Sequence, residues 1–535
     1  MTKEDLRQFL DQNFGEAGKE LEDCPPPDWK ESLSITNCLT SASLKLMVNE
    51  IDKLWLTLGK RIKDEVKESD AHRTLELLPH SFVIPGGRFR EIYYWDTYWI
   101  VRALVLSEMF ATTRGILLNF FHQIRQHGMV PNGSRTYYCK RSQPPFLISM
   151  VKHYLDNTGD YDLLVDNIDL LVVEMDWWRD NRRVTVNNKH KMFRYDSGSR
   201  GPRPESYLED VEAAHLSDIH NTEEEKEMLY RNIKAVAESG WDFSSRWMID
   251  TEGRVGSGTE QVRILDILPV DLNALMYKNY VNLVDMMKKV GRLEEVDRFT
   301  RMAEELREAV MEVMFEPETK TWRDFDMLRN KQNPYYFASN LFPLWAGCYP
   351  PDMRVELGEA GAAYLEQGDY IWPGGLVTSE FWSGQQWDAP NCWAPLQHLV
   401  VAGLIKCGGV NARRVAKKIA RHFVTSAMVW CNNETCEFYE KYDGANPTEV
   451  AGGGEYLVQL GFGWTNGVIL DFIQMFGDDA LSPWVSARMA KCDEANPSSL
   501  TVPGKERRGS DCSMTDTIKE AMASLKVLLE YTDKL

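Results

Sequence analysis

The sequence contains no apolar run that approaches the roughly 18 residues of a membrane-spanning helix. Its first residues, MTKEDLRQFLDQNF, have neither the basic region nor the apolar region of a secretory leader. We therefore expect no membrane segment and a protein that is cytoplasmic as written. The alternative is a secreted form that lacks its signal peptide, and the sequence predicts no particular oligomeric state.

Patterned cysteines, histidines and basic residues are also lacking. The ten cysteines form no CxxC pair and are too few for a disulfide framework in 535 residues. His122 and His127, like His215 and His220, are five residues apart, whereas two zinc ligands on one helix face are four apart. The net charge is −19 and no Lys/Arg cluster forms a phosphate-binding stripe. We therefore expect neither a metal ion nor a nucleic-acid partner.

Helical periodicity, by contrast, is abundant. Apolar residues recur at steps of three and four residues in four segments, at 44–62, 164–178, 302–313 and 518–529. Alternating, strand-like runs are few and short. The sequence therefore predicts an all-α fold, which we divide into an N-terminal extension (1–40), a main helical unit (41–490) and a linker with a C-terminal helix (491–535).

Loops rich in glycine, proline, tryptophan and charged residues separate the helices. They span 83–96, 129–146, 196–207, 238–247, 371–393 and 438–467. Loops of this kind carry function more often than helices do. One site can be assembled from all of them only if each helix pair returns to the same rim, as in an (α/α) barrel. On pattern alone, other large helical architectures stay open, because no exact repeat is present.

The first of these loops, PGGRFREIYYWDTYW at 85–99, contains a glycine pair that permits a tight turn and presents Arg88 beside Trp95 and Asp96. A rigid arginine among aromatic rings suits a sugar, and the alternative is a structural turn in which the arginine closes a salt bridge. Two further loops, MVPNGSRTYYCKRSQPP and GPRPESY, add polar side chains, some on backbone stiffened by proline. These are Asn132, Arg141, Gln143, Arg203 and Glu205.

Candidate catalytic carboxylates lie in the later loops. In ESGWDFSSRW, Asp242 stands between Trp241 and Phe243, an apolar setting that raises the pKa of a carboxyl group as a general acid requires. The alternative is an aspartate that caps the preceding helix. EFYEKYD and GGGEYLVQLGFGWTNG supply Glu440 and Glu455 as candidate bases. The glycines before Glu455 are no phosphate loop, since no GK[ST] follows them.

QQWDAPNCWAP at 385–395 offers Trp387 and Asp388 to a sugar ring, although two tryptophans in a core look the same. This segment and PGGRFREIYYWD resemble the two signature patterns of trehalases, and GGGEYLVQLGFGWTNG is similar to their glycine-rich segment. The resemblance runs from about residue 26 to about residue 478. It implies an (α/α)6 barrel with long loops at the active-site rim, which hydrolyses α,α-trehalose to two glucose molecules by inversion and without a cofactor.

Site residues follow from the same resemblance. Asp242 matches the general acid and Glu440 the general base, with Glu455 as the rival base, and Cys392 stands where relatives usually carry glycine or alanine. We expect that cysteine to narrow the pocket rim slightly. The substrate-binding residues implied are Arg88, Trp95, Asp96, Asn132, Arg141, Gln143, Arg203, Glu205, Gly240, Trp387, Asp388 and Glu455.

Two rival functions stay open at this point. One is another glycosidase or a sugar phosphorylase on a similar barrel, which release of glucose from trehalose but not maltose, without phosphate, would separate. The other is a catalytically inactive sugar-binding protein. The presence of Asp242 and Glu440 and of the three arginines Arg88, Arg141 and Arg203 argues against it.

Overall fold

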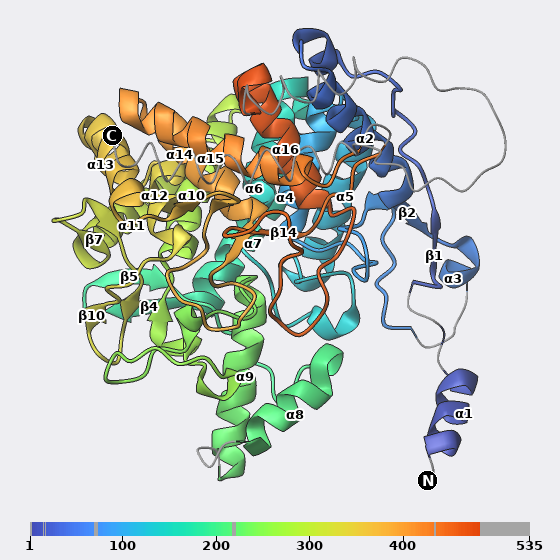
Figure 1. Cartoon of the computed structure of the whole chain (residues 1–535). Helices are drawn as coiled ribbons and strands as arrows, with labels where there is room; N and C mark the ends of the chain where they lie inside the picture. The colour runs from blue at the N-terminus through green and yellow to red at the C-terminus, as the bar shows by residue number, and fades with distance from the viewer. Residues whose placement is uncertain are drawn as a thin grey trace, which may run out of the picture.

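The computed structural model describes residues 3–13, 15, 18–68, 73–216, 221–432 and 435–481. Within these ranges the protein is mainly helical, as predicted, and its strands are only two to four residues long (Figure 1). The predicted linker and C-terminal helix at 491–535 lie outside the described residues. The three-part division of the chain therefore stays a prediction.

Six helices of the described chain form a closed inner ring, in which each contacts the next and the last contacts the first. In order around the ring they are α4 (Asp96–Leu106), α6 (Leu147–Thr158), α10 (Val270–Lys289), α12 (Phe342–Ala346), α14 (Ala394–Cys407) and α16 (Gly463–Phe476). α4, α14 and α16 are buried on nearly every side. Their residues are accordingly apolar or small around most of the helix rather than along one stripe.

A second set of helices packs outside this ring and alternates with it along the chain. They are α2 (Ala42–Leu58), α5 (Phe110–His127), α7 (Tyr161–Arg182), α11 (Val296–Val313), α13 (Arg354–Gln367) and α15 (Val410–Met428). Each has a solvent-facing side, and in α11 the buried residues Phe299, Ala303, Leu306, Val310 and Val313 recur at helical spacing. Inner and outer rings together make the predicted (α/α)6 barrel.

Long and short connections lie at opposite ends of this barrel. The chain enters its inner helices through the long segments 59–95, 128–146, 183–269, 314–341, 368–393 and 429–462. It leaves them through short ones, such as 107–109 and 159–160. Because the inner helices are all entered at the same end, the long loops gather there, on the lower side in Figure 1.

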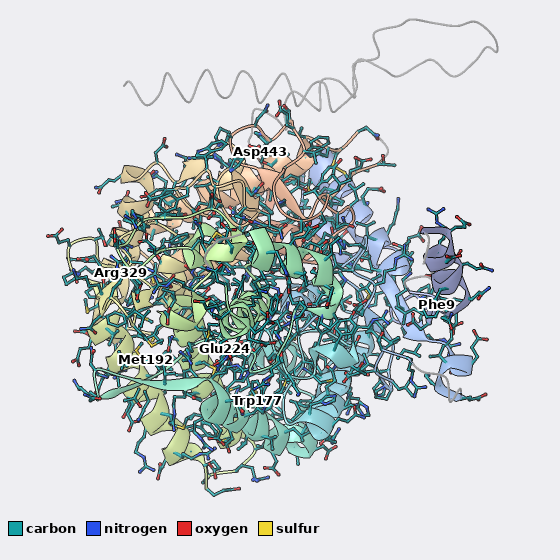
Figure 2. All side chains as sticks on the ribbon, turned by 90° about the horizontal axis from the view of Figure 1, so that it is seen from below. Phe9, Trp177, Met192, Glu224, Arg329 and Asp443 are labelled. Carbon is teal, nitrogen blue, oxygen red and sulfur yellow. A yellow bond between two sulfur atoms is a disulfide. The ribbon has the colours of Figure 1, made fainter. Side chains whose placement is uncertain are left out.

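Four helices of the described residues stand outside the two rings. They are α1 (Lys3–Asn13), α3 (Asp64–Glu68), α8 (Tyr207–Leu216) and α9 (Glu223–Ser239). Figure 2 looks onto the loop end, where Glu224 at the start of α9 lies near the centre and Phe9 of α1 lies beside the rounded body. α9 therefore projects from the middle of the loop end, and its C-terminal part is the buried part.

The short strands fasten the loops to one another. β1 (Leu21–Asp23), β2 (Gly59–Ile62) and β3 (Phe82–Val83) form an antiparallel sheet that ties the N-terminal extension to the barrel. β6 (Ile267–Leu268), β9 (Phe325–Asp326) and β10 (Lys331–Gln332) form a second. The antiparallel pairs are β4 (Arg183–Val186) with β5 (His190–Phe193), β7 (Phe315–Glu316) with β8 (Thr321–Trp322), β11 (Ile371–Trp372) with β12 (Gly375–Leu376), and β13 (Asn391–Trp393) with β14 (Lys441–Asp443).

The periodic segments at 164–178 and 302–313 lie inside α7 and α11, so both helix predictions are confirmed. The first prediction ran too far. α2 ends at Leu58, and Ile62 belongs to β2, because Gly59 leaves the helical conformation and the next residues pair with β1. Within the described residues one disulfide joins Cys431 to Cys436. None of the described helices is both long enough and apolar enough to cross a membrane.

Candidate active site

The long loops enclose a cavity of about 1090 Å³. Five of the six long connections supply site residues predicted from the sequence to the cavity wall, and 314–341 supplies none of these. One further predicted residue, Asp96, directly follows the connection 59–95. The predicted residues that line the cavity are Arg88, Trp95, Asp96, Asn132, Arg141, Gln143, Arg203, Glu205, Gly240, Asp242, Trp387, Glu440 and Glu455. The fold thus brings together side chains that are more than 300 residues apart in sequence.

Arg88 is presented by the glycine turn that the sequence predicted. Gly86 and Gly87 have φ values of 119° and 58°, and a Cβ at Gly87 would lie 2.3 Å from Oε1 of Gln459. That oxygen accepts a hydrogen bond from the Arg88 backbone N–H at 2.7 Å. The guanidinium lies 4.9 Å from the ring centroid of Tyr456. The turn therefore holds Arg88 against an aromatic ring at the cavity wall.

The amide residues are held in place by backbone contacts. The side-chain nitrogen of Asn132 donates to the carbonyl oxygens of Ser142 and Ala237, at 3.3 and 3.2 Å. Oε1 of Gln143 accepts from the Trp95 N–H at 3.1 Å. Both side chains line the cavity and also join the loop 128–146 to neighbouring segments.

Two buried arginines pair with carboxylates across the cavity wall. Arg141 donates a hydrogen bond to Glu205. Arg203 donates to Asp210 from Nε at 3.0 Å and from Nη2 at 2.7 Å. The Nη2 atom of Arg203 also lies 3.3 Å from the carboxylate of Glu455. Burial alone would raise the pKa of Glu205, but the adjacent Arg141 outweighs it and the pKa is lowered. These arginines are therefore oriented by charge-assisted bonds.

Asp242 lies directly after α9. The helix is capped by Gly240 with φ 75°, so the capping alternative for Asp242 is wrong. A Cβ at Gly240 would lie 2.7 Å from Cε2 of Trp95, so only glycine fits this close approach. Burial raises the pKa of Asp242 to about 7, partly opposed by Arg203. Asp242 thus has the environment expected of a carboxyl group that keeps its proton near neutral pH.

The segment 385–388 holds the backbone at Asp242 in place. The side-chain amide of Gln386 donates to the Asp242 carbonyl oxygen, and the Trp387 N–H donates to that of Phe243 at 3.0 Å. The ring of Trp387 stacks on Trp241 with centroids 5.4 Å apart. Predicted residues from two distant motifs therefore position one carboxyl group.

Asp388 does not line the cavity, which corrects its prediction as a substrate contact. The side chain is fully buried, and it accepts hydrogen bonds from Ser244 Oγ (2.9 Å), the Ser245 N–H (2.7 Å), Ser379 Oγ (2.7 Å) and Ser383 Oγ. With its oxygens turned to these donors, Asp388 fixes the chain just after Asp242.

Cys392 is likewise absent from the cavity wall. It is fully buried in β13, where its sulfur would lie 2.8 Å from a Cβ at Gly444. The expectation that it narrows the pocket rim is therefore wrong, because the side chain points into the packing between the loops.

Glu440 enters the cavity from β14's side of the barrel and is 1% exposed. Tyr456 donates its hydroxyl to Oε1 at 2.7 Å, and the backbone N–H of Gln459 lies 3.4 Å from Oε2. Burial raises the pKa of Glu440 to about 7, against the effects of Tyr456 and of the adjacent Lys441. Glu440, which is buried, and Asp242, which is half-buried, thus face one cavity.

Several cavity residues were missed by the sequence reasoning. They are the aromatic residues Phe89, Tyr93, Tyr137, Tyr138, Tyr456, Phe462 and Trp464 among others. Their signal was present, since most of them lie inside the quoted motifs. Tyr456 follows Glu455 directly, and its bond to Glu440 depends on how the long connection 429–462 folds back on itself, which sequence spacing does not reveal.

Arg246 was also missed, although it belongs to the Asp242 motif. It is fully buried and makes paired bonds to Asp271 and Asp324, all between 2.7 and 2.8 Å. Its guanidinium lies 4.5 Å from the ring centroid of Trp241. Arg246 therefore anchors the loop after Asp242 to α10 and to the segment before β9.

Among the described residues, one group of side chains has the types and spacing of metal ligands, and it consists of Glu76, His127 and Cys139. None of these three lines the cavity. Asp242 and Glu440 belong to no such group within the described ranges.

Comparison with known proteins gives a consistent result. The sequence model of the family described as Trehalase matches residues 1–477. A trehalase from Apis mellifera is 40% identical, covering 89% of this chain and 76% of its own, and one from Homo sapiens is 39% identical, covering 89% and 81%. The solved neutral trehalase from Saccharomyces cerevisiae superposes with a TM-score of 0.60 at 24% identity, over 75% of this chain and 74% of that one.

Proposed function

Since the chain belongs to the trehalase family, we propose that its cavity binds α,α-trehalose and that Asp242 and Glu440 hydrolyse it with inversion at one anomeric carbon. The reaction is that of a glycoside hydrolase and yields two glucose molecules. The observation that supports the assignment of residues is that Asp242 and Glu440 face one cavity and that burial raises the pKa of each to about 7. Such a pair supplies both the proton and the base that acetal hydrolysis needs. Asp96, a third carboxyl group in that wall whose pKa burial also raises, is assigned to substrate binding.

Asp242 is the general acid. Its burial favours the protonated form, and the tight contacts of Gln386 and Trp387 with the backbone at 242–243 fix its position. In the reaction it protonates the oxygen that bridges the two glucose units, so that one glucose leaves as a neutral alcohol.

Glu440 is the general base rather than Glu455. The Tyr456 hydroxyl stabilises its ionised form, and the carboxylate can then remove a proton from the attacking water. Glu455 is paired with Arg203 at 3.3 Å and its side chain is 30% exposed. A carboxylate engaged with an arginine at the rim is better suited to hold Arg203 than to accept a proton.

The remaining cavity residues bind the sugar. The guanidinium groups of Arg88, Arg141 and Arg203 are held by aromatic and carboxylate neighbours and offer donors to hydroxyl groups. Trp387 and Trp95 add apolar surface to the cavity wall, although the ring faces of Trp387 are stacked on Trp241 and Trp393. Water is thus displaced from both rings before the bond is broken.

The decisive experiment is proton NMR of the products in the first minutes of hydrolysis at high enzyme concentration. Inversion makes the attacked glucose appear as the β-anomer, while the departing glucose keeps its α-configuration, so the early ratio is about one to one. Absence of β-glucose at early times refutes the inverting mechanism. Maltose should release no glucose, and phosphate should have no effect on the rate.

The residue assignment is tested with matched variants. Asp242→Asn and Glu440→Gln should each lose roughly 100-fold or more in turnover, because each removes one proton-transfer group and little volume. Glu455→Gln is the control and should lose less. If Glu455→Gln loses more turnover than Glu440→Gln while its folding is preserved, Glu455 is the general base and Glu440 is not.

A further inference from the structure

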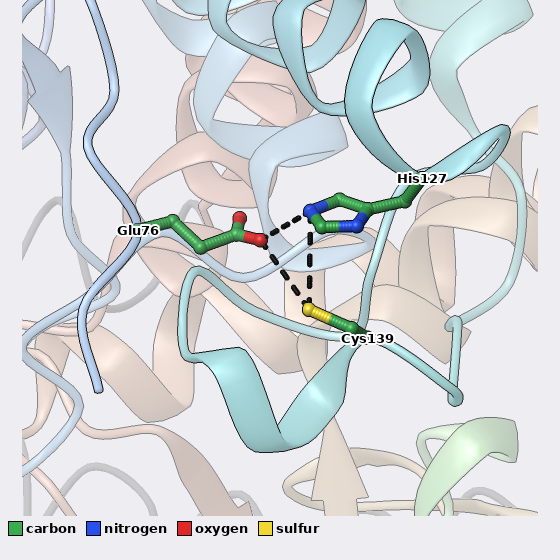
Figure 3. Close-up of side chains that lie close together, drawn as sticks. All are labelled: Glu76, His127 and Cys139. Atoms are coloured by element: carbon green, nitrogen blue, oxygen red, sulfur yellow. Dashed lines mark hydrogen bonds and ion pairs between the residues drawn. The ribbon is translucent and has the colours of Figure 1, made fainter. Parts of the chain in front are cut away.

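Glu76, His127 and Cys139 come from three separate segments and converge outside the catalytic cavity (Figure 3). Glu76 precedes β3, His127 is the last residue of α5, and Cys139 directly follows the short turn 136–138. One ligand atom from each lies within 4.8 Å of the other two. Imidazole, thiolate and carboxylate are the protein ligands that Zn²⁺ takes.

Two of the three distances between ligand atoms suit a tetrahedral ion. With zinc bonds of about 2.3 Å to sulfur and about 2.1 Å to nitrogen and oxygen, tetrahedral angles put sulfur about 3.6 Å from each of the other two ligands. Cys139 Sγ lies 3.4 Å from Glu76 Oε1 and 3.8 Å from His127 Nε2. The third pair, Nε2 and Oε1, is joined by a direct hydrogen bond. On binding, the ion would replace the proton of this bond, and the two atoms would move apart to about 3.4 Å.

The three side chains are held by a fixed framework. The Glu76 N–H bonds to the carbonyl oxygen of Ser134 at 2.9 Å, and Leu75 pairs with Arg135. Gln123, one turn earlier on α5, donates to the second carboxylate oxygen of Glu76 at 2.7 Å. A second donor that orients a ligating carboxylate is a regular feature of metal sites.

The site is buried yet reachable. The Glu76 side chain is 6% exposed, the His127 side chain is 22% exposed, and Cys139 is half-buried. Carboxylate and thiolate together carry two negative charges, which balance one divalent cation. An ion can therefore enter from solvent and leave no net buried charge.

We propose that Glu76, His127 and Cys139 bind one Zn²⁺ ion, which clips the loop 128–146 to the segment before β3. The same loop carries Arg141, two residues after Cys139. The backbone N–H of Arg141 donates to the carbonyl oxygen of Tyr138 at 2.8 Å. The bound ion thus fixes the loop through residues that do not line the cavity. On binding, the Cys139 thiol loses its proton to solvent, and the proton of His127 moves to Nδ1.

The probe is Co²⁺, added to the full-length metal-free protein and then displaced by Zn²⁺. One equivalent should produce a thiolate-to-cobalt charge-transfer band together with the intense visible bands of tetrahedral cobalt. Cys139→Ser should lose the charge-transfer band, and both Cys139→Ser and His127→Gln should bind at least about 100-fold more weakly, the upper end of what loss of outer-shell support alone costs. Zn²⁺ should also raise the melting temperature of the parent protein but not of these variants.

Cys38→Ser and His215→Gln are the matched controls, since both remove an exposed ligand type elsewhere in the chain. They should bind metal as the parent protein does. The proposal is overturned if the parent gives no charge-transfer band, or if Cys139→Ser and His127→Gln bind Co²⁺ as tightly as the controls. These readouts do not depend on trehalose, so they stand or fall separately from the proposed catalytic function.

Discussion

Replacement of Asp388 by alanine tests whether this residue supports the site or binds the sugar. Its carboxylate receives hydrogen bonds from four donors, three of which belong to fully buried residues: Ser244, Ser245 and Ser379. The fourth donor, Ser383, is half-buried, so water can replace its bond. Alanine leaves the three buried donors without an acceptor.

The expected cost follows from that count. A buried donor left unsatisfied costs about 1–3 kcal/mol, so three of them cost at least about 3 kcal/mol. That is a large share of a net stability of roughly 5–15 kcal/mol. Asp388→Asn keeps one acceptor oxygen for the Ser245 N–H, and the serine hydroxyls can rotate to accept from its amide. We expect it to lose only about 1–2 kcal/mol.

Urea denaturation measures the stability, and steady-state kinetics on trehalose measure the effect on the site. Because the chain at 244–245 follows Asp242, Asp388→Asn should lower kcat and leave KM within a few-fold of the parent value. Asp352→Asn, an exposed residue in one of the short connections, is the control for loss of one charge. Unchanged stability of both Asp388 variants, with KM raised tenfold or more, would mean that Asp388 touches the sugar and that our reasoning is wrong.

Three further predictions follow from the buried charges. Activity should be bell-shaped in pH with a maximum near neutrality, because burial raises the pKa of both Asp242 and Glu440 to about 7 and only one of the two must keep its proton; a rate that is flat from about pH 5 to about pH 9 contradicts this. Arg141→Lys should lower kcat/KM by about 10- to 100-fold, since lysine loses the planar fork that meets Glu205, and near-normal kinetics would make Arg141 a structural charge only. Burial also raises the pKa of Asp52 from 3.8 to about 7. The folded state therefore keeps a proton that the unfolded chain has lost, and the free energy of unfolding falls progressively as pH rises from about 4 to about 7. In urea denaturation, Asp52→Asn should therefore add up to about 4 kcal/mol at pH 8 and little at pH 4, and an equal gain at both pH values would refute the assignment.

Sequence periodicity identified one class of helix in this barrel and not the other. The periodic segments that became α2, α7 and α11 are all outer helices, which have one buried and one exposed face. α14 and α16 are buried on nearly all sides, so polar residues do not alternate with apolar ones along them. A search for one apolar stripe therefore finds the outer ring, and closure of the inner ring had to come from the family resemblance.

The direction of a side chain within a loop was the other unpredictable quantity. Trp387 and Asp388 are neighbours in one motif, yet Trp387 lines the cavity and Asp388 points into the protein, where four donors meet it. Composition places both residues in a sugar-binding loop equally well. Only the path of the loop, set by the bonds that Gln386 and Trp387 make to the backbone at 242–243, decides which of them faces the substrate.

The cluster of Glu76, His127 and Cys139 was not predicted from the sequence, for a related reason. Ligand spacing was tested along single helices, where His122 and His127 fail, whereas the partners of His127 are 51 residues before it and 12 residues after it. They meet because the backbone at 134–136 pairs with the backbone at 74–76. The loop 128–146 consequently has two functional sides, with Arg141 facing the cavity and Cys139 facing Glu76. A residue that holds one side of this loop also sets the position of the other, which is why an ion at Cys139 can fix Arg141 without touching the sugar.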